Sequence, residues 1–286
     1  MNMDEIEFNI RNATPSDRSR LANLIHFSPY IHQHLDWKPP LEWIGSKPYL
    51  LIENNSSLLA TLACPPDVPE ITWIRLFAIS TMIPVKKAWR LLWSATLHEL
   101  VTASVQRIAA LSLQSWFNKI LEESDFVHTD NVIVLMWDNT IPYPEPKSMD
   151  ITIRPMLPED LKTVVSVDNL AFEIDWRNSF ESLELAFQQS TLASVAESGE
   201  EIVGYQYSTS SGMGGHLARL AVKPTMQGKG IGYSLVHNVL QHFRKQGVIH
   251  VTVNTQQNNT TSLALYAKAG FTITGESYRV YQYHNT

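Results

Sequence analysis

Apolar residues in the second half of the chain recur at intervals that predict a helix between two strands. Within residues 230–245 they lie four apart, at Ile231, Leu235, Val239 and Phe243. Residues four apart share one helical face, so this stretch predicts an amphipathic helix. Runs near 215–222 and 248–254 predict a strand on either side of it, and the second run is rich in β-branched residues. A helix of this length between two such strands indicates a parallel crossover connection.

The other elements of this half alternate in the same way. A strand is predicted at 151–154, and helices are predicted within 158–189. The remaining predicted elements are strands near 191–197 and 201–209, a helix at 259–269, and a final pair of strands around Phe271 and Tyr281. The predicted fold class is therefore mixed α/β (α+β), with a central sheet flanked by helices.

The first half of the chain repeats features of the second half at a shift of 143 residues. Residues 10–17, a short strand followed by a proline and an acidic helix start, match residues 153–160. At the same shift, Leu76–Ile79 stands opposite Arg219–Val222. The stretch Pro142–Pro146 holds three prolines and predicts a stiff, extended linker. We therefore expect two related domains, 1–146 and 147–286.

The two halves nevertheless differ in composition. Gly45 is the only glycine of the first half, whereas the other eleven follow residue 198. Without glycine a backbone cannot turn through positive φ without strain or approach a ligand closely. The first half therefore cannot use glycines for such turns or close approaches as the second half can.

Composition and charge exclude several classes of protein. The chain has 286 residues, 44% of them hydrophobic and 17% charged, which excludes disorder, collagen and coiled coil. Its net charge of −6 makes nucleic acid and anionic membrane surfaces poor partners. The single cysteine, Cys64, excludes an internal disulfide and a multi-thiolate metal site. An acidic amino terminus and the lack of a long apolar run agree with a cytoplasmic chain without a signal peptide or membrane span.

The strongest chemical signal is an alternation of glycines where a predicted strand gives way to a helix. Gly228, Gly230 and Gly232 follow the strand that ends at Val222. Such a turn bares consecutive N–H groups at a helix amino terminus, where the helix dipole attracts an anion such as a diphosphate. No Walker spacing is present, and Tyr233 stands where a dinucleotide fingerprint has its third glycine. The plain alternative is a helix that happens to begin with glycines, although each interior glycine costs about 1 kcal/mol relative to alanine.

At these residues the chain resembles the GNAT superfamily of acetyl-CoA-dependent N-acetyltransferases. The superfamily signature Q/R-x-x-G-x-G/A is met by Gln227, Gly230 and Gly232. A second signature is met by Asn259, Tyr266, Gly270 and Phe271. The resemblance extends over residues 151–284 and reaches the first half only through the repeat. It implies two GNAT-like domains, of which one carries catalysis, as in tandem members of the superfamily.

The resemblance implies a site for acetyl-CoA in the second domain. The main chain of Leu220 and Val222 would pair with the pantetheine arm as an added strand does, and Asn259 would help to fix that arm. The pyrophosphate would lie on the amides of Gln227, Gly228, Lys229, Gly230, Ile231 and Gly232.

The resemblance also implies catalytic roles. Tyr266 would protonate the departing thiolate; otherwise it is an aromatic residue on an amphipathic helix. His216 takes the position of a general base, and a pKa near 6.5 suits that task, although a strand histidine without such a role is the alternative. Asn254 stands where one subgroup has a catalytic glutamate, which leaves proton transfer through water open.

The acceptor is expected to be a small-molecule amine or a peptide amine, and the sequence does not choose between them. Phe172–Trp176 is the candidate acceptor loop, with two carboxylates and two aromatic rings; helix-capping acids and a core tryptophan are the alternative. The predicted activity is acyl transfer to a primary amine by direct attack. A non-catalytic acyl-CoA sensor and an enzyme that acetylates a protein amino terminus or lysine remain alternatives.

The first domain has lost the corresponding residues. At the 143 shift Pro84, Lys87 and Trp89 replace Gln227, Gly230 and Gly232, while Leu121 or Glu123 stands in place of the tyrosine. Proline supplies no N–H, and the indole fills space that a diphosphate would need. We expect this copy to lack the cofactor loop and to serve a structural or substrate-shaping role.

Overall fold

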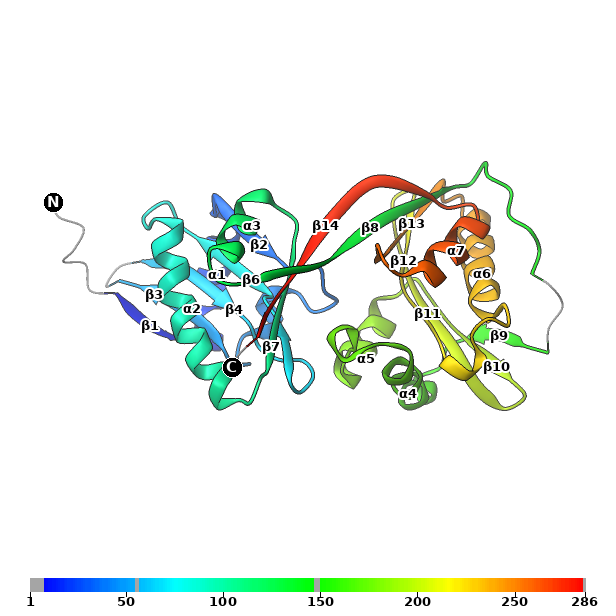
Figure 1. Cartoon of the computed structure of the whole chain (residues 1–286), viewed down its shortest axis with the longest axis horizontal. Coiled ribbons are helices and arrows are strands. Elements are labelled where there is room, and N and C mark those ends of the chain that lie inside the picture. Colours follow the sequence, from blue (N-terminus) through cyan, green and yellow to red (C-terminus); the bar gives the residue numbers. More distant parts are fainter. Residues whose placement is uncertain (1–7, 55–56, 147–149, 285–286) are drawn as a thin grey trace. The chain divides into compact units, whose positions relative to one another are not determined.

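The computed structural model describes residues 8–54, 57–146 and 150–284. Two compact units are present: unit 1 takes the chain up to Thr129 and again from Arg279, and unit 2 takes Asp130–Tyr278. Each unit has a sheet flanked by helices (Figure 1). The mixed α/β class predicted from the apolar pattern is thereby confirmed.

Unit 2 contains the elements that the glycine turn and the second motif predict. Its strands are the greater part of β8 (Val127–Asp138), β9 (Thr152–Pro155), β10 (Leu192–Ser198), β11 (Glu201–Ser211), β12 (Gly214–Val222), β13 (His250–Gln256) and the first part of β14 (Thr272–His284). Its helices are α4 (Leu161–Ala171), α5 (Phe180–Gln189), α6 (Ile231–Lys245) and α7 (Thr260–Lys268), with 3-10 turns η4 (Pro158–Asp160), η5 (Ile174–Trp176) and η6 (Pro224–Met226).

The sheet of unit 2 runs in the order β14-β8-β13-β12-β11-β10-β9. Strands β12 and β13 are parallel and are joined through α6, so the predicted crossover is confirmed. Helices α4 and α5 lie on one face of this sheet, and α6 and α7 lie on the other (Figure 1). The apolar stripe of α6 is buried: Ile231, Leu235, Val239 and Phe243 are each at most 1% exposed.

The predicted final pair of strands is wrong, because residues 272–284 form one strand, β14. Gly275, within this strand, adopts a positive φ of 91°. The strand continues through that glycine because it has partners on both sides of it. Thr272 and Thr274 bond to β8, and residues 279–284 pair with β7 of unit 1.

Unit 1 has a shorter sheet in the order β1-β3-β4-β6-β2, and β5 pairs in parallel with β7. Its strands are β1 (Asn9–Asn12), β2 (Tyr30–Gln33), β3 (Tyr49–Glu53), β4 (Leu58–Ala63), β5 (Ile71–Trp73), β6 (Leu76–Ile79), β7 (Arg107–Ser112) and the end of β14. Its helices are α1 (Arg18–Phe27), α2 (Val85–Thr102) and α3 (Ser115–Glu122), with 3-10 turns η2 (Pro15–Asp17) and η3 (Pro40–Trp43).

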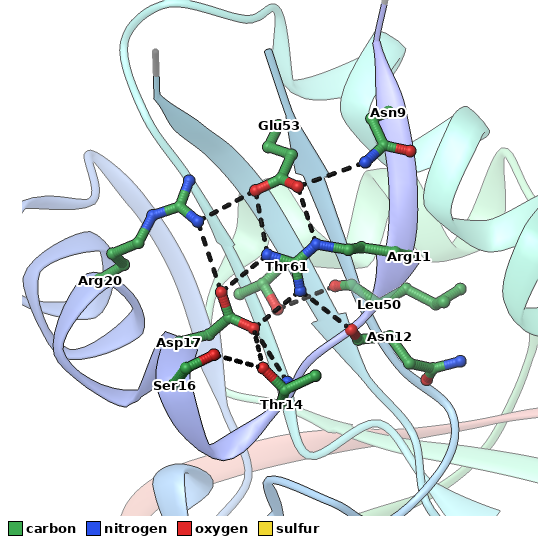
Figure 2. A network of polar contacts seen from close by, with 10 residues as sticks. All are labelled: Asn9, Arg11, Asn12, Thr14, Ser16, Asp17, Arg20, Leu50, Glu53 and Thr61. Atoms are coloured by element: carbon green, nitrogen blue, oxygen red, sulfur yellow. Dashed lines mark hydrogen bonds and ion pairs between the residues drawn. The ribbon is translucent and has the colours of Figure 1, made fainter. Parts of the chain in front are cut away.

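The sequence repeat has a structural counterpart in a duplicated ion network. In unit 1, Arg11 binds Asp17 and Glu53, with both nitrogen–oxygen distances at 2.7 Å (Figure 2). In unit 2, Arg154 binds Asp160 and Glu197 at 2.6 Å each. Hydrogen bonds from the arginine hold the pKa of each aspartate below its usual range. Each network ties the first strand of its unit to the following helix start and to a neighbouring strand.

The proline-rich stretch at 142–146 belongs to unit 2 by its contacts. The Tyr143 ring meets Trp137 at 5.7 Å and His237 at 5.0 Å between ring centroids. The division between the units therefore runs through β8 and β14 and not through the stretch expected to link them. Strands β8 and β14 each contribute residues to both units. The sequence near residue 147 has no local pattern that would predict this division. The adjoining residues 147–149 lie outside the described residues.

Candidate functional site

Strand β12 changes its pairing halfway along. It pairs with β13 only from Gly214 to Leu217, and it pairs with β11 up to Val222. The register between β12 and β11 shifts beside Ala218, which is an extra residue and forms a β-bulge. After Leu217, β12 and β13 part, and the second half of β12 has an edge that β13 does not cover.

The alternation of the sheet shows which main-chain groups lie on that edge. The N–H of Lys223 donates to Val203 on β11 at 2.8 Å. Since successive residues of an antiparallel strand direct these groups to opposite sides, Leu220 and Val222 direct theirs away from β11. The Nε2 of Gln227 donates to the Val222 carbonyl at 3.0 Å, which ties the following turn to the end of the strand.

The glycine turn that follows depends on two positive φ angles. Gly228 has φ 74° and Gly230 has φ 90°, a region that other residues enter at a cost. Gly230 is the N-cap of α6, and no side chain caps this helix. The first-turn N–H groups of α6, those of Ile231, Gly232 and Tyr233, lack partners within the helix. With no acidic residue in this turn, the helix start is suited to an external anion.

Gly232 serves a different purpose, which is close packing. A Cβ at this position would lie 3.3 Å from Leu265 Cδ2 and 3.8 Å from side-chain atoms of Leu220 and Val222. The missing side chain therefore lets α6 approach both α7 and β12. The plain alternative, glycines without a use, does not describe this turn. Lys229 is exposed beside it, with Nζ 3.3 Å from Met226 Sδ.

Helix α7 carries both residues of the second motif that were assigned roles. The Asn259 Oδ1 accepts the Ser262 N–H at 3.0 Å and so caps the helix. Its Nδ2 and the second lone pair of its Oδ1 remain for the ligand contact predicted from the sequence. Tyr266 is 5% exposed and packs on Phe271. Burial raises the pKa of its phenol, so the hydroxyl keeps its proton at neutral pH.

His216 lies on β12 two residues before the bulge and is half-buried. Its Nδ1 lies 2.9 Å from Thr252 Oγ1, and this hydroxyl lies 3.3 Å from the Gly215 carbonyl, to which it donates. The hydroxyl therefore accepts from Nδ1–H, which leaves the lone pair on Nε2. Burial lowers the pKa of His216, so the ring is neutral at neutral pH and able to accept a proton. Asn254, two residues after Thr252, is exposed on the same strand.

Sequence reasoning missed a buried ion pair between α4 and β12. Asp168 of α4 is fully buried, and Arg219 of β12 binds it through Nε at 2.6 Å and through Nη2 at 2.9 Å. The Tyr205 hydroxyl donates to the same carboxylate. An aspartate on the apolar face of α4, next to the buried Val164 and Val167, was the available signal.

This ion pair also anchors the loop expected to receive the acceptor. The Arg219 guanidinium stacks 3.9 Å from the Phe172 ring centroid, and its Nη2 donates to the Trp176 carbonyl at 2.7 Å. Phe172 and Trp176 therefore fix the loop in place. Of its two acids, Glu173 is exposed and Asp175 is half-buried.

In unit 1 the chain itself covers the edge that is open in unit 2. Strand β2 pairs with β6, so that His32 faces Phe77 and Tyr30 faces Ile79. Phe77 and Ile79 are the counterparts of Leu220 and Val222 at the 143 shift. Residues 30–33 are likewise the counterparts of residues 173–176. The segment that forms a separate turn in unit 2 is thus an added strand in unit 1.

The helix start of unit 1 is also closed to a diphosphate. Pro84 is the N-cap of α2, in place of a residue with an N–H. Trp89, which replaces Gly232, is 4% exposed and stacks on Trp93. Both observations support the expected loss of cofactor binding in this copy.

The structure describes residues 8–54, 57–146 and 150–284. No helix among them is both long and apolar enough to span a bilayer. They also hold no group of three or more His, Cys, Asp or Glu residues placed to bind a metal ion. Cys64 is buried, and burial raises the pKa of its thiol to about 12.

Comparisons with known proteins identify the second unit. A family model described as "Acetyltransferase (GNAT) domain" matches residues 167–282. A mycothiol acetyltransferase of Streptosporangium roseum is 33% identical over 78 residues, which are 25% of this chain and 23% of the relative. The spore coat polysaccharide biosynthesis protein SpsD of Bacillus subtilis is 36% identical over 90 residues, 32% of this chain and 30% of the relative. The matched segments thus span less than a third of these curated relatives.

Solved structures match nearly the whole chain. A GCN5-related N-acetyltransferase from Sphaerobacter thermophilus covers 97% of this chain and 96% of its own, with TM-score 0.63 and 16% identity. A tandem GNAT protein from the clavulanic acid biosynthesis pathway covers 98% and 99%, with TM-score 0.66 and 12% identity. At these identities the likeness concerns the fold alone.

Proposed function

The chain belongs to the GNAT superfamily, and on that premise we propose that unit 2 transfers an acetyl group from acetyl-CoA to a primary amine by direct attack. One observation carries the proposal. The uncapped, glycine-rich start of α6 lies directly after the strand whose second half has an uncovered edge. Helix-start N–H groups, which suit an anion, thus follow in the chain directly after main-chain groups that can pair with an extended arm.

The residues present fit coenzyme A. The N–H groups of Ile231, Gly232 and Tyr233 would bind its pyrophosphate, and the turn at Gln227, Gly228, Lys229 and Gly230 would surround it. The uncovered edge at Leu220 and Val222 would pair with the pantetheine arm. The cofactor supplies an acyl group activated as a thioester, with a thiolate as its leaving group. The Leu220 N–H on this edge is the proposed donor to the oxyanion.

Two side chains of unit 2 would handle the protons. An alkylammonium has a pKa of about 10 and must lose a proton before it can attack. His216 Nε2 has the free lone pair to take that proton, directly or through a water molecule. Tyr266 Oη keeps its proton at neutral pH and would give it to the thiolate. The Asp168–Arg219 pair holds the loop at 172–176, which would border the acceptor.

A non-catalytic acyl-CoA-binding protein is the second candidate. Asn254 favours it, because an amide at this exposed position cannot act as an acid or base. An enzyme that acts on a protein amino terminus or lysine differs from the first proposal only in its acceptor.

Release of free thiol distinguishes these proposals. The full chain is incubated with acetyl-CoA and a panel of small amines, amino sugars and amino-terminal peptides, and free thiol is measured. We expect release that depends on one class of amine and that the His216→Gln variant loses. Binding of CoA without release across the panel supports the sensor. Absence of CoA binding contradicts both proposals.

A further inference from the structure

A groove of about 500 Å³ lies within unit 1, between α2 and α3. Its lining includes Lys86, Arg90, Ser94, Leu97, Asp125 and Tyr283. Arg90 and Ser94 are exposed one turn apart on α2, and Tyr283 comes from the end of β14. Nothing in the proposed acetyl transfer uses this groove.

The internal repeat assigns a counterpart to each wall of the groove. At the 143 shift Arg90 corresponds to Tyr233 and Ser94 to His237, both on α6. Tyr283 pairs with Ile108 on β7, and Trp137 pairs with Val251 on β13. Because Val251 is the counterpart of Ile108 at the same shift, Tyr283 corresponds to Trp137. Unit 2 therefore has the same groove between its own two helices.

In unit 2 this groove is filled by the chain's own segment 141–146. The Tyr143 ring lies against Trp137 and His237, as described above, and Arg244 lies 5.0 Å from its centroid. The Tyr233 hydroxyl donates to the Pro144 carbonyl at 2.5 Å.

The residues on either side are close to unit 2 as well. The Glu145 Oε2 lies 3.1 Å from His237 Nε2, and the Ile141 side chain covers Gly270. The occupant is thus an extended, proline-flanked aromatic residue followed by an acid.

We propose that the groove of unit 1 is a docking site for an extended peptide of a partner protein, with an aromatic residue between prolines and an acidic residue after it. The aromatic ring would pack on Tyr283 as Tyr143 packs on Trp137. Ser94 is smaller than His237 and leaves room for that ring. Arg90 would receive the acid, whereas the other cation of the groove, Lys86, is already paired with Glu123 at 2.6 Å.

The test uses the full chain and a fluorescein-labelled peptide Ile-Pro-Tyr-Pro-Glu-Pro, the sequence that fills the groove of unit 2. Fluorescence anisotropy should show saturable binding to the unaltered chain. The Ser94→Trp variant fills the groove and should weaken binding about tenfold or more. His98→Trp, an exposed position on the same helix outside the groove, is the matched control and should bind normally.

Two further changes test the chemistry of the site. Replacing the peptide tyrosine by alanine, or making Arg90→Glu in the protein, should also weaken binding about tenfold. Circular dichroism melting verifies that each variant is folded. Absence of binding to the unaltered chain, or equal binding to the Ser94→Trp and His98→Trp variants, overturns the proposal. Equal affinity for the tyrosine and alanine peptides overturns it as well.

Discussion

At the scale of single residues, burial decides the protonation states on which the proposed chemistry depends. Tyr266 is almost wholly shielded from water and His216 is shielded in part, and the effect on each is to favour the neutral form. A neutral imidazole can accept a proton and a neutral phenol can donate one. The two side chains therefore have the states that a base and an acid need before the reaction begins.

The Tyr266 hydroxyl is the first residue-scale prediction. Tyr266→Phe removes the proton donor but keeps the ring that packs on Phe271, so kcat should fall about 100-fold while the Kd for CoA stays the same. Steady-state kinetics and calorimetry measure the two quantities. If kcat is unchanged, the acid is another group.

The pH dependence of the reaction follows from His216. Because burial lowers its pKa, the base form persists below pH 6.5, and the acidic limb of the kcat/KM profile should lie below that value. Activity should be present above this limb and lost as pH falls through it. In His216→Gln the limb should disappear and the rate should fall. A limb that persists unchanged in this variant assigns the titration to a different group.

The buried Asp168–Arg219 pair makes a prediction about stability. Asp168→Asn leaves a buried guanidinium without its counter-charge and should lower the free energy of unfolding by about 3 kcal/mol. Glu201→Gln breaks the exposed pair with Lys223, which also joins β11 to β12, and should cost less than about 1 kcal/mol. Urea unfolding of both variants gives the comparison. Equal losses would show that burial does not distinguish the pairs.

At the scale of elements, the site depends on how β12 ends and how α6 begins. The bulge at Ala218 and the end of pairing with β13 leave the strand edge uncovered. The positive φ angles of Gly228 and Gly230 then turn the chain so that α6 begins with uncapped N–H groups. Neither element provides the proposed site without the other.

A pair of glycine variants tests this arrangement. Gly230→Val and Gly247→Val each place a β-branched residue at positive φ, 90° and 78°, at opposite ends of α6. Both should destabilise the chain to a similar degree. Only Gly230→Val should abolish CoA binding in calorimetry. Loss of binding in both variants, or in neither, contradicts the proposed location of the pyrophosphate.

At the scale of the whole molecule, the two units differ in the segment beside the strand edge. Residues 173–176 form a turn held by Arg219, whereas their counterparts 30–33 form a strand along β6. The strand occupies the edge where unit 2 is proposed to bind pantetheine. We therefore propose that one copy carries the catalysis and that β2 closes the other copy to the cofactor.

The number of CoA molecules bound follows from this difference. Calorimetry on the full chain should give one CoA per chain, and the Gly230→Val variant should give none. A second equivalent of bound CoA, retained in that variant, would place a site in unit 1 despite β2.

The sequence by itself determined the repeat, the parallel crossover and the position of the glycine turn. These features depend on residues close together in the sequence. The period of the apolar residues indicates which face of a helix is buried, and a glycine indicates where the backbone can adopt a positive φ. The residues of the second motif were also found in this way, since Asn259 and Tyr266 lie on one short helix.

Only the tertiary structure decided the features that join residues far apart. Three such features are the Asp168–Arg219 pair, the strand β2 beside β6 and the single strand β14. Each depends on contacts between residues that are distant in the sequence, so no local periodicity predicts it. Burial of a charge or the choice of a strand's partner depends on the free energy of the whole sheet. The groove of unit 1 also depends on the tertiary structure, because its lining residues come from α2, β14 and the end of α3.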